Sequence, residues 1–168
     1  MSQPKFCQPF LEALLEVKIA KIDVIDKQKD LKDTYDAHGI RLDVYVKDKK
    51  GTIYDVEMQT TTQEALEKRI RYYQSGIDRY ALATSRKYKN LSDSYIIFIC
   101  LDDYFNQQLA RYDRISYIVD AKDPTKTPIC DYCDGSHVII LNASFLTGNT
   151  DDVVLDFLRY AWHTYNKQ

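Results

Sequence analysis

Apolar and polar positions alternate with two periods along the chain, one typical of helices and one of strands. Residues Phe10–Glu16 place apolar side chains at helical spacing and predict a short amphipathic helix. Val17–Ile25 alternates well enough for a strand or an extended connector, whereas the polar run Lys27–Asp36 is typical of an exposed loop or a lid. No repeat or low-complexity linker divides the 168 residues, so we expect a single domain, 1–168.

A β-hairpin followed by a long helix is the most regular part of the pattern. Ile40–Val46 and Thr52–Gln59 alternate apolar, often β-branched, residues with polar ones, which predicts two half-buried strands. Lys47–Gly51 forms the turn between them, with Gly51 providing a permissive backbone. The hydroxyl residues of Thr60–Glu64, followed by a glutamate, indicate a helix start, and we expect this helix to run to about Tyr88.

The second half of the chain contains one run that is apolar on both faces. Ser94–Leu101 therefore predicts a central strand covered by helices on both sides. Ile115–Val119 and His137–Leu141 predict further strands, and Asp151–Tyr165 predicts a closing amphipathic helix. This order of elements predicts the α/β class, with a mixed β-sheet flanked by helices.

Composition narrows the class of protein but not its partner. With 45% hydrophobic and 29% charged residues the chain is of an ordinary globular type. We find no apolar run long enough to span a bilayer and no signal-peptide pattern, so we expect a cytoplasmic protein. The net charge of −2 neither supports nor excludes DNA binding, because the basic residues occur in local groups that can form a stripe on a neutral protein.

Two of the four cysteines raise the question of a zinc site. Cys130 and Cys133 are three apart, and His137 follows them. A structural zinc site normally needs four ligands, usually from two such pairs, and the sequence has no second pair. An exposed, reduced loop is the better interpretation.

The candidate chemistry lies on the hairpin. Glu57 and Gln59 are two apart on one strand and leave the same face, and Asp43 lies on the neighbouring strand, where it can stand beside Glu57. Two converging carboxylates, with the carbonyl of Met58, would suit Mg²⁺, Mn²⁺ or Ca²⁺. The plain alternative is a pair of solvent-facing acids on an edge hairpin. Their apolar neighbours, Leu42 among them, favour the metal site.

These residues are part of a longer resemblance. The stretch from Arg41 to Gln59 resembles the signature of the recombination-promoting nuclease/putative transposase family, within the PD-(D/E)XK nuclease superfamily. The similarity continues in order through Lys68–Ser75, Tyr95–Cys100 and Ile140–Phe145, and spans about Phe10 to the end.

That resemblance implies a restriction-endonuclease-like core and metal-dependent cleavage of DNA, with Asp43 and Glu57 as the acidic residues. The lysine of the superfamily pattern falls on Gln59, which is typical of this family but leaves weak or conditional activity open. The additional helix that family members carry before the part matching Phe10 is expected to be missing. Glu12 or Glu16 could then substitute for an acid from that helix.

The helix after the hairpin supplies the DNA-contact candidates. In a nuclease, Arg69 or Arg71 would contact phosphate, Tyr72 would contact DNA, and Gln74 would position a water. It is equally open that these residues have only ordinary surface and core roles. The leading hypothesis is a Mg²⁺-dependent DNA endonuclease. The alternatives are an inactive nuclease-fold module that binds DNA or a protein partner, and a homo-oligomer assembled through the last helix around Trp162.

Overall fold

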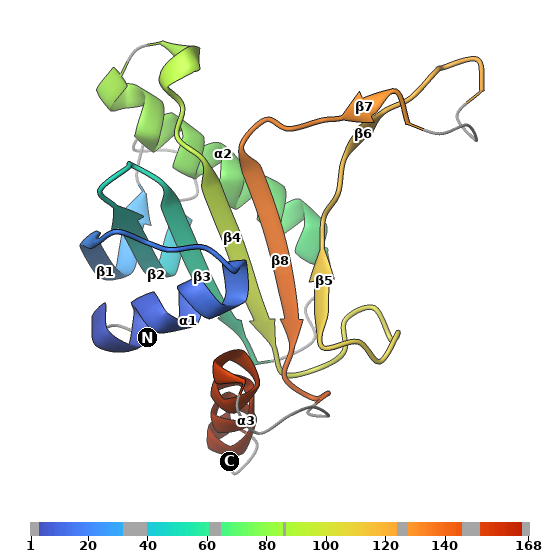
Figure 1. The fold of residues 1–168 in the computed structure, drawn as a ribbon. Helices are drawn as coiled ribbons and strands as arrows, with labels where there is room; N and C mark the ends of the chain where they lie inside the picture. Colours follow the sequence, from blue (N-terminus) through green and yellow to red (C-terminus); the bar gives the residue numbers. More distant parts are fainter. Residues whose placement is uncertain are drawn as a thin grey trace.

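The computed structural model describes residues 4–31, 40–60, 65–85, 87–123, 128–145 and 152–165. Its centre is a six-stranded mixed sheet in the order β1-β2-β3-β4-β8-β5 (Figure 1). The strands in that order are Ile22–Leu31, Ile40–Asp48, Ile53–Gln59, Ser94–Cys100, Ser136–Asn142 and Arg111–Asp113. β1, β2 and β3 are antiparallel, β3, β4 and β8 are parallel, and β5 runs antiparallel to β8. The expected mixed α/β architecture is confirmed.

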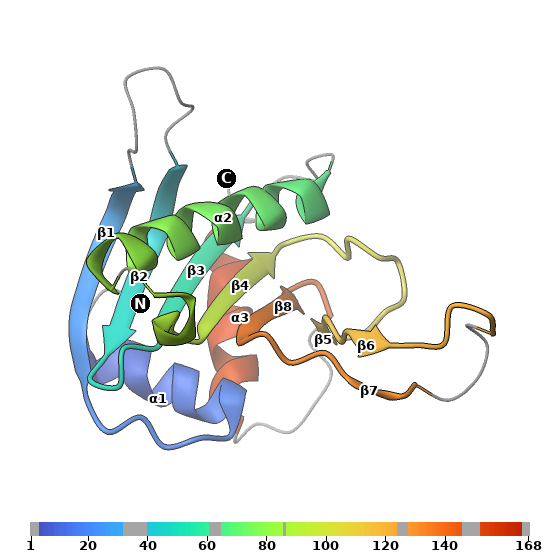
Figure 2. The same ribbon diagram turned by 90° about the horizontal axis from the view of Figure 1, so that it is seen from above.

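Helices cover both faces of this sheet. α1 (Pro4–Leu15) and α3 (Val153–Tyr165) lie on one face, and α2 (Leu66–Ser85) crosses the other, as the two perpendicular views show (Figures 1 and 2). β4 lies between them and is buried from Ile96 to Cys100, because its side chains meet helices on both sides. The apolar run Ser94–Leu101 was therefore correctly predicted as the central strand.

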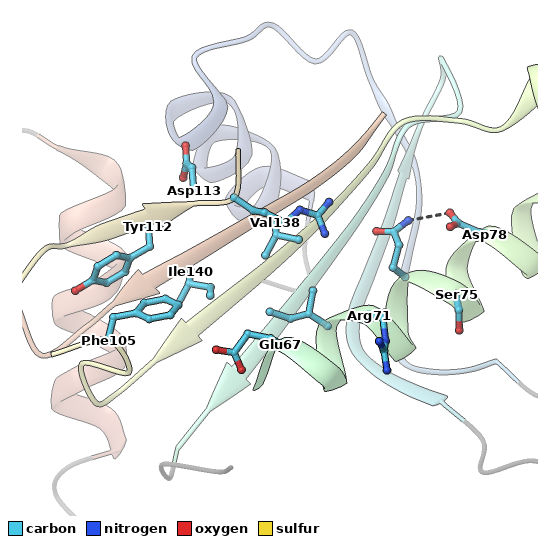
Figure 3. Close-up of a pocket in the computed structure, with 12 residues that line it drawn as sticks. Glu67, Arg71, Ser75, Asp78, Phe105, Tyr112, Asp113, Val138 and Ile140 are labelled. Carbon is cyan, nitrogen blue, oxygen red and sulfur yellow. Dashed lines mark hydrogen bonds between the residues drawn. The ribbon is translucent and has the colours of Figure 1, made fainter. Parts of the chain in front are cut away.

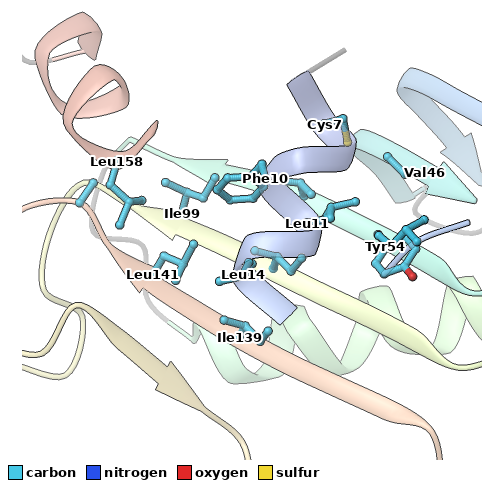
Figure 4. Close-up of a cluster of buried hydrophobic side chains, with 14 of the residues drawn as sticks. Cys7, Phe10, Leu11, Leu14, Val46, Tyr54, Ile99, Ile139, Leu141 and Leu158 are labelled. Carbon is cyan, nitrogen blue, oxygen red and sulfur yellow. The ribbon is translucent and has the colours of Figure 1, made fainter. Parts of the chain in front are cut away.

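Two apolar clusters form the core, one on each face of the sheet. Under α1 and α3, Phe10, Leu14 and Leu158 pack against Ile99 and Leu141 (Figure 4). The rings of Phe10 and Phe157 lie 4.7 Å apart and join the two helices. Trp162 of α3 is half-buried and packs against this cluster.

Under α2 the second cluster joins helix residues such as Ile70 and Ile77 to Ile40, Ile96 and Phe98 of the sheet. Gly76 lets α2 approach β2 closely, because a Cβ at this position would collide with the Ile40 Cδ1 atom. The glycine is therefore explained by packing, since in a helix interior it otherwise costs about 1 kcal/mol relative to alanine.

The hairpin turn between β2 and β3 is held by a buried aspartate. Asp48 is 6% exposed, and its carboxylate accepts hydrogen bonds from the backbone N–H groups of Lys50 and Thr52 and from the Tyr54 hydroxyl. Gly51 has a φ of 93°, a conformation that non-glycine residues rarely adopt. The predicted turn and the role of its glycine are confirmed.

Several boundaries differ from those expected. β1 continues to Leu31, so the part of the predicted loop from Lys27 to Leu31 is an edge strand; residues 32–36 lie outside the described residues. α2 ends at Ser85, and the 3₁₀ turn η1 (Tyr88–Asn90) follows. Of the helix-start residues, 61–64 also lie outside the described ones.

A two-stranded ribbon extends from the body beyond β5. It consists of β6 (Tyr117–Ile118) and β7 (Cys130–Asp131), and it projects away from the sheet (Figure 2). The predicted strand Ile115–Val119 is thus reduced to two residues and belongs to a separate ribbon. The short strands β5 and β7 were not predicted.

Candidate active site

The candidate site lies where β2 and β3 separate. Their ladder runs from Lys47 opposite Ile53 to Val44 opposite Val56. Beyond this pair, side chains replace the backbone hydrogen bonds. The Asp43 N–H donates to Glu57 Oε1 at 2.7 Å, and the Met58 N–H donates to Asp43 Oδ2 at 3.1 Å. Each carboxylate is therefore fixed by the main chain of the other strand, as the expected register requires.

The separation coincides with a change of face in β2. Residues two apart on a regular strand share one face, yet Leu42 packs in the cluster under α2 and Val44 in the cluster under α1 and α3. β1 is distorted at the same level, because Gln28, between the pairs Lys27–Val44 and Lys29–Leu42, has a φ of 56°. Asp43 stands at this twist and is exposed, although both of its neighbours pack into the core.

Burial dominates the electrostatics of Glu57. The residue is 3% exposed, and burial raises the pKa of its carboxyl to about 7. The N–H of Asp43 lowers this pKa, whereas the Asp43 carboxylate raises it. A buried group that ionises near neutrality is typical of functional sites, since such a group is balanced between its charged and neutral forms.

Asp55 is a third acidic residue that the sequence analysis did not single out. It is fully buried, two residues before Glu57 on β3, and its pKa is raised well above its ordinary value by burial and by Glu57. No N–H or O–H group of the described residues donates to its oxygens. Burial and the neighbouring Glu57 carboxyl therefore both disfavour the charged form of Asp55. The even spacing of Asp55, Glu57 and Gln59 was the signal that could have identified it.

Gln59 and Met58 complete the end of β3. Gln59 is 7% exposed, follows Glu57 on the same face, and its backbone oxygen accepts a hydrogen bond from Leu101 N–H at 3.0 Å. The Met58 side chain packs with the cluster under α1 and α3. The described residues contain no group of three or more His, Cys, Asp or Glu side chains that could hold a metal ion.

Asp43, Glu57 and Met58 line a cavity of about 600 Å³. β1 contributes Lys27 and Gln28 to its wall, and α3 contributes Tyr160. Sequence analysis missed these residues because it placed Lys27 in a loop and gave the last helix no role at the site. The sheet topology, which sets β1 beside β2, places Lys27 on the wall of this cavity.

The glutamates of α1 do not join this cavity. Glu12 accepts hydrogen bonds from the Ile19 N–H and the Gln8 amide, and so fixes the connection between α1 and β1. Glu16 is exposed. Neither residue lines the wall formed by Asp43 and Glu57.

The four DNA-contact candidates on α2 are dispersed. Arg69 is half-buried, its guanidinium lies 4.8 Å from the Phe98 ring centre, and its charge lowers the pKa values of Asp55 and Glu57. Tyr72 is 41% exposed. Arg71 and Gln74 line a different cavity, which shares no described residue with the one around Glu57. Gln74 therefore lines a cavity other than the one that Asp43 lines.

The cysteine pair lies in the projecting ribbon. Cys130 belongs to β7, and hydrogen bonds from Ile129 N–H to Ile118 and from Tyr132 N–H to Ser116 keep the segment extended. β7 ends at Asp131, so Cys133 lies beyond the strand. Both thiols are exposed and free, in agreement with the preferred interpretation.

Comparison with known proteins identifies the family. The model of the PD-(D/E)XK nuclease family transposases matches residues 4–127, which is more than half of the chain. The chain belongs to this family. The mixed six-stranded sheet flanked by helices is consistent with its nuclease-like fold, and nucleases of the PD-(D/E)XK type generally use divalent metal ions. Neither the curated proteins nor the solved structures gave a match. Within the described residues, none of the helices combines the length and apolarity needed to cross a membrane.

Proposed function

We propose that this protein is a metal-dependent DNA endonuclease that hydrolyses phosphodiester bonds at the cavity between β2 and β3. The observation that carries the proposal is the reciprocal arrangement of Asp43 and Glu57, in which each carboxylate is held by the other strand's backbone N–H and both line one cavity. Family membership supports a nuclease or transposase function in general.

The donor set fits a hard divalent cation. Mg²⁺ is usually bound through one or two carboxylates and retains several waters, so Asp43 and Glu57 with the Met58 carbonyl are sufficient ligands. Burial is the main cause of the raised pKa values of Glu57 and Asp55, and a cation bound beside them would favour their ionised forms. When bound, the ion would polarise the phosphate and lower the pKa of a coordinated water.

The protein's own groups prepare the site for this chemistry. Glu57 must lose its proton to act as a ligand, and Arg69 favours that loss because its charge lowers the Glu57 pKa. Gln59 occupies the position of the superfamily lysine, where its amide can orient a water but carries no charge. Lys27, on the wall of the same cavity, supplies a positive charge near the phosphate position.

A second candidate function is a nuclease-fold module that binds DNA or a protein without cleaving it. Gln59 in place of lysine is the observation that favours it, because a neutral amide stabilises developing negative charge less well. The two functions differ in one respect: the endonuclease requires Asp43 and Glu57 to cleave DNA, whereas the module does not cleave DNA.

Plasmid cleavage separates these functions. Supercoiled plasmid is incubated with Mg²⁺, Mn²⁺ or Ca²⁺ and either the wild type, Asp43→Asn or Glu57→Gln. Asp23→Asn, an exposed β1 aspartate that does not line the cavity, is the matched control.

We expect nicking by the wild type and the control with Mg²⁺ or Mn²⁺, and background levels with the two site variants. Equal nicking by all four proteins excludes the proposed enzyme. DNA binding without cleavage by any of them assigns the module.

A further inference from the structure

A second cavity, of about 490 Å³, lies between α2 and the strands β5 and β8 (Figure 3). Its floor is apolar, formed by Val138 and Ile140 of β8 and by Ile70 of α2. Two aromatic side chains, Phe105 and Tyr112, close one end, with ring centres 4.9 Å apart. A cavity of this size and apolar character can enclose most of a small molecule.

The carboxylates of this cavity are already engaged. Each accepts a hydrogen bond from a neighbouring side chain: Glu67 from the Tyr104 hydroxyl at 2.9 Å, Asp78 from the Gln74 amide at 2.8 Å, and Asp113 from Arg111 at 2.7 and 2.8 Å. The charge of Asp113 is compensated by Arg111, whereas Glu67 and Asp78 are each hydrogen-bonded by a neutral group.

Among the described residues, neither arginine of the cavity is hydrogen-bonded to a carboxylate, although the charge of Arg114 lowers the pKa of Asp134. Among the described residues, no carboxylate lies within ion-pair distance of Arg71, and Arg71 is exposed at the rim. Arg114 donates to the backbone oxygen and the hydroxyl of Ser136, both at 2.8 Å, and neither acceptor is charged. Two guanidinium groups are thus available to an anionic ligand, and guanidinium binds phosphate oxygens in a planar, often bidentate manner.

Gln74 adds an unused acceptor to the wall. Its amide nitrogen donates to Asp78 and, at 2.7 Å, to the Ser94 hydroxyl, and these two bonds fix the orientation of the side chain. Its amide oxygen is buried and has no hydrogen-bond donor among the described residues. A buried acceptor without a donor costs free energy, so a ligand that donates to it would be favoured.

We propose that this cavity binds a nucleotide unit, with the base over the apolar floor beside Phe105 and Tyr112 and the phosphate at Arg71 and Arg114. Nucleobases stack on aromatic side chains regardless of sequence, and an exocyclic amine or ring N–H can donate to the Gln74 oxygen. A purely apolar ligand would leave that oxygen without a donor and Arg71 without an anionic partner. A free nucleotide and an unpaired nucleotide of single-stranded DNA share this chemistry, and the site does not depend on metal-assisted cleavage.

Calorimetric titration of the full chain with deoxynucleoside monophosphates tests the proposal. We expect the monophosphates to bind saturably. The nucleoside and inorganic phosphate should each bind at least about tenfold more weakly, because the first lacks the phosphate and the second lacks the base. Arg71→Gln should weaken binding about tenfold or more. Ser75→Tyr should block the cavity from its exposed rim, without altering the floor.

Two controls locate the binding. Lys68→Gln removes the same charge from an exposed position on α2 that does not line the cavity, so it should bind as the wild type does. Glu57→Gln should also bind normally, which separates this site from the proposed metal site. A short single-stranded oligonucleotide that displaces the monophosphate indicates DNA as the source, and monophosphate binding that persists in its presence indicates a free nucleotide.

Three results would overturn the proposal. The first is the absence of monophosphate binding at millimolar concentration. The second is equal weakening by Arg71→Gln and Lys68→Gln with no effect of Ser75→Tyr, which would indicate general electrostatic attraction. The third is binding that is lost in Glu57→Gln and retained in Arg71→Gln, which would place the ligand at the carboxylates.

Discussion

Replacing Glu57 by glutamine should stabilise the protein above neutral pH while removing its proposed metal ligand. The side chain is 3% exposed, and its carboxyl ionises at a pKa of about 7 in the fold, against an ordinary value of 4.5. Glutamine keeps an oxygen that can accept the Asp43 N–H, and its NH₂ group can donate to Asp55. It therefore resembles the protonated form of Glu57, which the fold prefers.

The magnitude follows from the pKa difference. One pKa unit corresponds to about 1.4 kcal/mol, so ionised Glu57 costs roughly 3 kcal/mol at pH 8 relative to the unfolded chain. The folded state holds its proton to higher pH than the unfolded state, so the wild-type free energy of unfolding falls as the pH rises from 4.5 to about 7 and then levels off. The raised pKa of Asp55 acts in the same direction.

Urea unfolding at pH 5 and pH 8, without divalent metal, measures this effect. We expect Glu57→Gln to raise the free energy of unfolding by up to about 3 kcal/mol at pH 8, or roughly 6–12 °C in Tm, and by much less at pH 5. Asp43→Asn, an exposed carboxylate on the same cavity, is the control and should change stability by less than about 1 kcal/mol. Destabilisation by Glu57→Gln at pH 8, or an equal effect at both pH values, would refute the reasoning.

Three further predictions concern the packing around the site. Gly76→Ala should destabilise the protein by roughly 1–3 kcal/mol because the added methyl group meets Ile40. Ile40→Val should relieve part of this loss in a double-mutant cycle measured by urea unfolding, and additive effects of the two substitutions would contradict the close approach of α2 to β2. Asp48→Ala should lower the free energy of unfolding by about 2–3 kcal/mol, measured by calorimetry, because three hydrogen bonds of the hairpin turn lose their acceptor. A decrease of less than about 0.5 kcal/mol would be inconsistent with that role. Phe10→Ala should cost about 3–5 kcal/mol and loosen α3 through the loss of its contact with Phe157, which hydrogen exchange of α3 would detect.

The sequence pattern was most informative where local periodicity and burial agree. β4 is apolar on both faces because it is covered on both sides, and the β2–β3 hairpin alternates around a turn fixed by Asp48 and Gly51. The end of β1 was missed because Lys27–Asp30 is polar. An edge strand with solvent on one side has no need of the apolar alternation that marks an interior strand.

The candidate site was only partly predictable, for a geometric reason. Adjacent strands made it reasonable to place Asp43 beside Glu57, and their backbone hydrogen bonds agree with this. The raised pKa of Asp55 and the position of Arg69 over the Phe98 ring depend on how α2 packs against the sheet, which local spacing does not report. Lys27 reaches the cavity only through the order of strands in the sheet.

Manganese binding, measured by calorimetry or by the electron paramagnetic resonance of Mn²⁺, tests most directly whether Asp43 and Glu57 hold a divalent cation. At pH 8 we expect one ion per chain for the wild type and for Asp23→Asn, and loss of this ion in both Asp43→Asn and Glu57→Gln. Undiminished Mn²⁺ binding by the two site variants, or no binding by the wild type at millimolar metal, would contradict the proposed metal centre.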